Sequence, residues 1–153
     1  MDINNIHLTT LIAWFSPGFP VGSFAYSHGL EAAIDNGIVD SKISLMEWLR
    51  GALLFGSPNN DAIILKEIYE AIIRNDCTSL KELSSLALTL NVASELIDES
   101  IVQGNAFWRV IQSAWPHNDF SYLQQHLPNN KIVYPVAVAI AAAKHEVPIL
   151  PSL

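Results

Sequence analysis

Helical periodicity over most of the chain limits what this sequence can fold into. Between Lys42 and Lys144, apolar residues recur at intervals of three and four, which places them on one face of successive helices. We find no long apolar–polar alternation with hairpin turns, which a β-sheet protein would need. We therefore expect an all-α fold, a single-domain multi-helix bundle, which 153 residues are enough to build.

Capping signals predict where three of these helices begin. Two Ser-x-x-Glu pairs have the spacing of a capping box. In this motif the serine side chain accepts a backbone N–H of the first helical turn, and the glutamate side chain accepts the backbone N–H of the serine. The pairs are Ser44 with Glu47 and Ser79 with Glu82. Between them, Asn60 is suited to be an N-cap. The first helix has one apolar face, formed by Leu45, Trp48, Leu49, Ala52 and Leu53.

The longest helix is predicted over residues 92–115. Its apolar seam alternates steps of four and three, as two closely packed helices require: Ile97, Ile101, Gly104, Trp108, Ile111 and Trp115. A glycine inside a helix costs about 1 kcal/mol, so Gly104 indicates that another backbone passes close by. The last helix is expected to begin at Pro135, a good first-turn residue, and to be rich in alanine.

The composition favours a protein that is covered by another chain. Hydrophobic residues make up 50% of the sequence and charged residues 15%, against roughly 25% charged in an average soluble domain. We expect apolar surface patches that a partner buries.

The net charge and the number of cysteines limit which classes of partner and which cellular compartment are expected. The net charge is −7 and the basic residues are scattered, which argues against nucleic acid as a partner. The longest run of small apolar residues, 133–143, falls short of the ~20 residues that a membrane span needs, so no membrane partner is expected. The single Cys77 and the lack of a basic signal-peptide region favour a reducing, cytoplasmic location.

Residues 16–31 break the helical pattern. Pro17, Gly18, Pro20 and Gly22 prevent a regular helix. Four side chains nevertheless make the segment more apolar than a solvated loop: Phe19, Val21, Phe24 and Tyr26. An ordered loop of this kind has to pack, either as a buried connector in its own domain or on a partner, and the sequence leaves both open.

Chemical roles for this loop and for the histidines have weaker support. A phosphate-binding loop would need a lysine near its glycines, and this loop has none. Residues 25–29 look like a relaxed nucleophile elbow with Ser27 as nucleophile, but an elbow follows a strand. The five histidines lack metal-ligand spacing, and His28 is more typical of a structural residue. The carboxylates Glu95, Asp98 and Glu99 are expected to form a solvated acidic face.

The same loop carries a resemblance to a known family. It resembles the N-terminal signature of the UreF family of urease accessory proteins, at Ser16, Pro17, Phe19, Pro20, Gly22, Phe24, Tyr26, Ser27, Gly29, Leu30 and Glu31. Further similarity follows in family order, at Glu99–Ser100, Gln103–Gly104 and Tyr134–Pro135. The resemblance covers nearly the whole chain, although UreF-like proteins continue past the alanine-rich helix into further helices.

The resemblance implies a non-enzymatic helical adaptor without a cofactor. UreF-like proteins bind the accessory protein UreD or UreH, and the pair recruits the GTPase UreG to apo-urease for nickel insertion. The resemblance also implies a homodimer where the C-terminal part is present. Residues 1–153 would form a single UreF-like domain that lacks the C-terminal helices. The signature residues, together with His28, Glu99, Gln103 and Gly104, are candidate partner-binding positions.

Two other functions remain open from the residues alone. One is a small serine hydrolase that uses Ser27, and the other is a helical bundle that associates only with itself.

Phe19, Phe24 and Tyr26 are candidate anchors, either on a partner or on the core of the chain itself.

Overall fold

A computed structural model describes residues 4–22, 29–90 and 93–148. All regular structure in these ranges is helical, which confirms the all-α prediction. In chain order the elements are α1 (Asn5–Trp14), α2 (Leu30–Asp35), α3 (Lys42–Phe55), α4 (Ser57–Ile73), α5 (Cys77–Ala87), α6 (Ser94–Ala114), α7 (Phe120–Gln124), the short 3-10 helix η2 (Pro128–Asn130) and α8 (Tyr134–Lys144).

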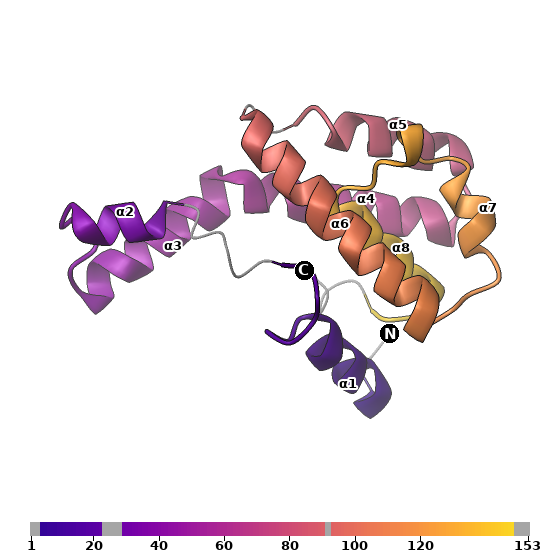
Figure 1. Ribbon diagram of the computed structural model, residues 1–153, viewed down its shortest axis with the longest axis horizontal. Coiled ribbons are helices and arrows are strands. Elements are labelled where there is room, and N and C mark those ends of the chain that lie inside the picture. The colour runs from indigo at the N-terminus through magenta and orange to yellow at the C-terminus, as the bar shows by residue number, and fades with distance from the viewer. Residues whose placement is uncertain (1–3, 23–28, 91–92, 149–153) are drawn as a thin grey trace.

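The alanine-rich helix α8 lies at the centre of the body. It packs against α4 and α6, and α5 packs on α4 (Figure 1). Nine consecutive residues, Pro135 to Ala143, are buried. Small side chains let the neighbouring helices approach α8 closely, which is why a helix that is apolar on all sides can form the core. Pro135 lies in the first turn, as predicted.

Gly104 marks the close contact between α6 and the chain that leads into α8. An added Cβ at this glycine would collide with backbone atoms of the 132–134 segment, the carbonyl oxygen of Ile132 among them. It would lie 2.6 Å from the Val133 carbonyl carbon and 2.7 Å from the Tyr134 nitrogen. The expectation that a second backbone passes beside Gly104 is confirmed.

The predicted helix starts are wrong by a few residues, because better caps lie upstream. For α3 the N-cap is Ser41, and Ser44 completes its capping box from the third helical position. The Ser44 N–H donates to Ser41 Oγ at 3.2 Å, and the Ser41 N–H donates to Ser44 Oγ at 3.0 Å.

The starts of α4 and α5 differ from prediction in the same direction. Instead of starting at Asn60, α4 begins at Ser57 after Gly56, with a proline in its first turn. The N-cap of α5 is Asp76, whose carboxylate accepts both the Ser79 N–H at 3.0 Å and the Ser79 hydroxyl at 2.6 Å. A carboxylate that accepts two bonds at a helix N-terminus caps it better than the serine one turn later.

The N-terminal helix α1 is tied to the body by two buried side chains, Leu11 and Trp14. The Trp14 side chain is 1% exposed. It makes edge-on contacts with the rings of Phe107, Trp115 and His145, with ring centroids 5.7, 6.2 and 6.0 Å apart. Such aromatic contacts contribute on the order of 1 kcal/mol each beyond the area they bury.

Helices α2 and α3 form an arm that extends away from this body (Figure 1). None of the 14 residues of α3, all of them described, is buried. Six large apolar side chains on α3 are exposed: Ile43, Met46, Leu49, Leu53, Leu54 and Phe55. The apolar surface expected from the composition is therefore present, and much of it lies on this arm.

Candidate partner-binding surface

The described part of the signature loop is fastened to the core by its apolar side chains. Phe19 and Val21 are buried. The Phe19 ring lies against the rings of Phe107 and Trp115, with centroids 5.2 and 6.4 Å apart. The Phe19 N–H donates to the Ser16 carbonyl at 3.0 Å, and Ser16 Oγ donates to the carbonyl of Ala13 at 3.1 Å. Phe19 is thus an anchor on the core of its own chain.

The rest of this loop faces outward. Pro17, Pro20 and Gly22 are exposed. Proline fixes φ, so the exposed side of the loop has little conformational freedom to lose on binding. Gly22 has φ +78°, a left-handed conformation that other residues rarely adopt.

From residue 29 onward, the signature residues form the start of α2. Gly29 is its N-cap, with φ +83°. Leu30 is half-buried, whereas Glu31 is exposed in the first turn, where a carboxylate is favourable beside the positive end of the helix. The remaining candidates, Phe24, Tyr26, Ser27 and His28, lie outside the described residues. The anchor roles of Phe24 and Tyr26 and the hydrolase role of Ser27 stay predictions.

The second group of candidate residues, on α6, has a packing role. Glu95 and Asp98 are exposed as expected, but Glu99 is 7% exposed and accepts a hydrogen bond from Gln103 Nε2 at 2.8 Å. The expectation of a solvated acidic face is therefore wrong for Glu99. The seam could not have indicated this, because at 100° per residue Glu99 lies on nearly the opposite side of the helix from Ile97 and Ile101.

Hydrogen bonds and burial attach α6 to the start of α8 at this point. Ser100 Oγ accepts the N–H of Tyr134 at 3.1 Å. Burial raises the pKa of the Tyr134 phenol to about 12. The Tyr134 ring also meets Phe107 edge-on, with centroids 5.6 Å apart.

Phe107 joins the two groups of signature residues. One side of its ring contacts Phe19 from the loop, and another contacts Tyr134 at the start of α8. Residues nearly 90 positions apart in the sequence therefore meet at one aromatic cluster. Of the loop signature, Phe19 belongs to this cluster, whereas the exposed signature residues are Pro17, Pro20, Gly22, Gly29 and Glu31.

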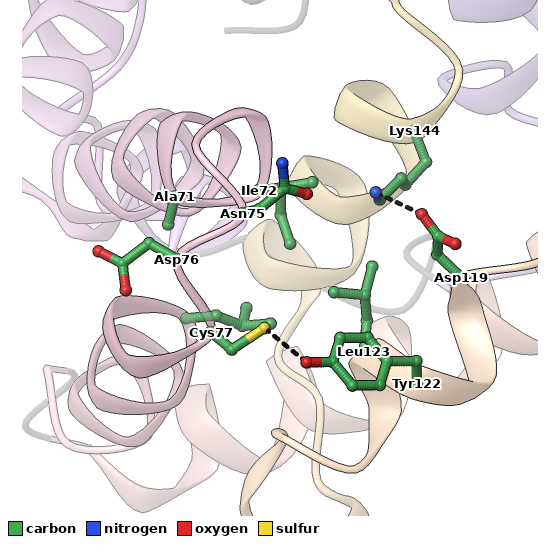
Figure 2. A pocket seen from close by; sticks show the side chains of 10 residues that line it. Ala71, Ile72, Asn75, Asp76, Cys77, Asp119, Tyr122, Leu123 and Lys144 are labelled. Atoms are coloured by element: carbon green, nitrogen blue, oxygen red, sulfur yellow. Dashed lines mark hydrogen bonds and ion pairs between the residues drawn. The ribbon is translucent and has the colours of Figure 1, made fainter.

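A separate cavity of about 330 Å³ lies where α4, α5, α7 and α8 meet. Figure 2 shows two polar pairs at its rim. Cys77 Sγ donates to Tyr122 Oη at 3.5 Å, and Lys144 Nζ donates to Asp119 Oδ2 at 2.6 Å. The bond from Lys144 lowers the pKa of Asp119. The sequence did not point to this cavity, because its polar partners lie 45 and 25 positions apart.

Neither a metal cluster nor a membrane span is found in the part of the chain that the structure describes. Over residues 4–22, 29–90 and 93–148, no three His, Cys, Asp or Glu side chains are grouped so that they could hold a metal ion. Over the same ranges, no helix has the length and apolar character to cross a bilayer.

Comparison with known proteins agrees with the resemblance seen in the sequence. The UreF family model matches residues 39–152. A protein named urease accessory protein UreF from Azorhizobium caulinodans is 42% identical over 138 residues, which cover 90% of this chain and 59% of the relative. Proteins of the same name from Methylobacterium radiotolerans and Magnetococcus marinus are 41% and 37% identical, over 88% and 92% of this chain and 58% and 61% of their own lengths.

The chain thus spans about three-fifths of the length of the curated relatives it matches. The match to the family model covers most of the chain, including the seam of α6 and the whole of α8. The chain belongs to the UreF family.

Proposed function

We propose that this chain acts in urease maturation as a non-catalytic adaptor. Together with a UreD- or UreH-type protein it recruits the GTPase UreG to apo-urease, in the cytoplasm, for nickel insertion. Membership of the UreF family and relatives named urease accessory protein UreF support this proposal. It includes a homodimer where the C-terminal part of the family's chain is present.

The observation that carries the proposal is the division of the signature loop into two sides. Phe19 and Val21 are buried in the core, while Pro17 and Pro20 remain at the surface. A loop held this way presents a fixed surface, and a fixed surface loses less conformational entropy when it binds a partner. Such a surface suits recognition of a protein.

A binding experiment with matched variants tests this role. Purified UreD- or UreH-type protein is immobilised, and retention of the wild-type chain is compared with that of the double variant Pro17→Ser/Pro20→Ser and of Glu31→Lys. Because these side chains are exposed, the fold should persist, while retention should fall at least about tenfold. Pro116→Ser, at an exposed proline between α6 and α7, is the matched control and should bind as the wild type does.

The outcome separates the adaptor role from a purely structural loop. Far-UV circular dichroism shows whether each variant remains folded. Folded loop variants that are retained as well as the wild type would contradict a partner surface at this loop. Labelling of Ser27 by a fluorophosphonate, with turnover of an ester, would instead support the hydrolase alternative.

A further inference from the structure

Helix α3 is mostly apolar, apart from Lys42, Ser44, Glu47 and Arg50, yet only one side of it is covered. On that side, the Trp48 ring lies under the start of α2, 3.9 Å from where a Cβ on Gly29 would be. Large apolar side chains along a helix normally pack against other protein segments. The described residues of α3 are nevertheless half-buried or exposed.

The uncovered side is an apolar stripe interrupted by the exposed Lys42 and Arg50, and we call it the α3 face. At 100° per residue its members fall within an arc of roughly 140°: Ile43, Met46, Leu49, Leu53 and Leu54. Leu53, for example, is 62% exposed. Spacings of three and four residues along the stripe are those by which one helix packs along another.

The relatives are longer than the matched region, and their additional residues are a source of helices that could cover this face. The matched 138 residues are 59% of the Azorhizobium caulinodans relative, so about 95 of its residues lie outside the match. A helix that covers the 14 residues of α3 needs to be only about 21 Å long at 1.5 Å per residue. The unmatched part is long enough for several such helices.

We propose that the α3 face is an internal packing surface of the UreF fold, and that its occupant is an amphipathic helix from the part of the family's chain that lies outside the matched region. The occupant carries an apolar stripe with matching three- and four-residue spacing. This inference rests on family membership and on the exposure of α3, and it does not depend on the adaptor role.

The charge within the face favours this occupant over a second copy of the chain. Arg50 is exposed and, by helical geometry, lies within the same arc as Ile43 and Leu53. Two copies that meet through this face would each bring two cations, Lys42 and Arg50, against one carboxylate, Glu47 at its edge, and this excess of like charge in an interface is costly. A helix of different sequence can place a carboxylate opposite Arg50 instead.

The first test supplies the occupant as a separate polypeptide. The probe is the portion of the Azorhizobium caulinodans relative outside the matched region, titrated into the 153-residue chain and followed by calorimetry and sedimentation. A complex of one probe to one chain is expected. Leu49→Asp and Leu53→Asp should each weaken it at least about a hundredfold, and Arg50→Glu about tenfold.

A matched control introduces an aspartate at an exposed apolar residue outside the α3 face. Val102 on α6 is 58% exposed, so Val102→Asp should leave the affinity unchanged. Formation of a dimer of the chain that excludes the probe would overturn the proposal in favour of a second copy. Uptake of the probe that is insensitive to Leu49→Asp and Leu53→Asp would overturn it in favour of another surface.

A second measurement decides the case in which the separate probe does not bind. The same segment is fused to the chain through a flexible linker, and thiol labelling of Leu53→Cys is measured in a Cys77→Ser background. The fusion should slow labelling at least about tenfold relative to the unfused chain, whereas Val102→Cys should label equally in both. Equal labelling of Leu53→Cys in both would overturn the proposal.

Discussion

Helices α8 and α3 are both rich in apolar residues, but they have opposite environments. Nine consecutive residues of α8 are buried between α4 and α6, whereas six large apolar side chains of α3 are exposed. A helix's composition therefore indicates that it requires burial, but it does not indicate which segment buries it. For α8 the covering helices lie in this chain, and for the α3 face we infer that they lie in the rest of the family's chain.

The largest difference between the two helices should appear when a large side chain is truncated in each. Ile140 on α8 is 0% exposed, so Ile140→Ala should lower the free energy of unfolding by about 3–4 kcal/mol, through lost burial and a residual cavity. Leu53→Ala on α3 should change it by less than about 0.5 kcal/mol. Urea denaturation measures both, and a comparable loss at Leu53 would show that the chain already buries α3.

The same contrast applies to two phenylalanines near the N-terminus. Phe19→Ala should cost about 3 kcal/mol, because it removes a buried ring that packs on Phe107 and Trp115. Phe15 is 45% exposed, and Phe15→Ala should cost under about 1 kcal/mol. Thermal unfolding of the two variants provides the comparison. Equal losses would mean that the loop is not fastened through Phe19.

A pair of glycine substitutions should give effects of opposite sign. Gly104→Ala places a methyl group against the backbone at 132–134, and this overpacking should outweigh the gain in helix propensity, for a net loss of about 2 kcal/mol. Gly51 on α3 has no atom within 4 Å of its added Cβ, so Gly51→Ala should stabilise the chain by up to about 1 kcal/mol. Stabilisation at Gly104 would contradict the close contact of α6 with the start of α8.

The smallest effect concerns the end of α8, where His145 is the C-cap. Burial lowers the pKa of His145 below its ordinary value, and the charge of His117 lowers it further, against a hydrogen bond with the Trp115 carbonyl. The unfolded chain therefore takes up the proton first. The stability that His145 contributes is complete above pH 6.5 and is lost as the pH falls toward the folded pKa. Tm should decline over this range in the wild type and less steeply in His145→Gln.

Periodicity predicted the features that depend on local spacing. The seam of α6 and the neighbour beside Gly104 follow from which residue types recur at three and four. The helix starts were misplaced because Ser41 and Asp76 compete as caps with the serines three residues later. Only the three-dimensional structure shows which cap is used.

Contacts between distant residues could not be predicted from spacing. Trp14 meets Phe107 and His145 across more than 90 positions, and Cys77 meets Tyr122 across 45. The apolar face predicted on α3 shares only Leu49 and Leu53 with the α3 face, and their exposure could not be predicted, because spacing records that a face is apolar and carries no information on its partner.

Helix α8 is covered by helices of this chain, whereas we infer that the α3 face is covered by a helix from the rest of the family's chain. Hydrogen–deuterium exchange on both helices, in the 153-residue chain and in the fusion with the relative's unmatched segment, tests it most directly. In the chain alone, amides of α8 should be strongly protected and those of α3 weakly. In the fusion, exchange in α3 should slow at least about a hundredfold while α8 is unchanged. Protection of α3 equal to that of α8 in the chain alone would contradict the claim.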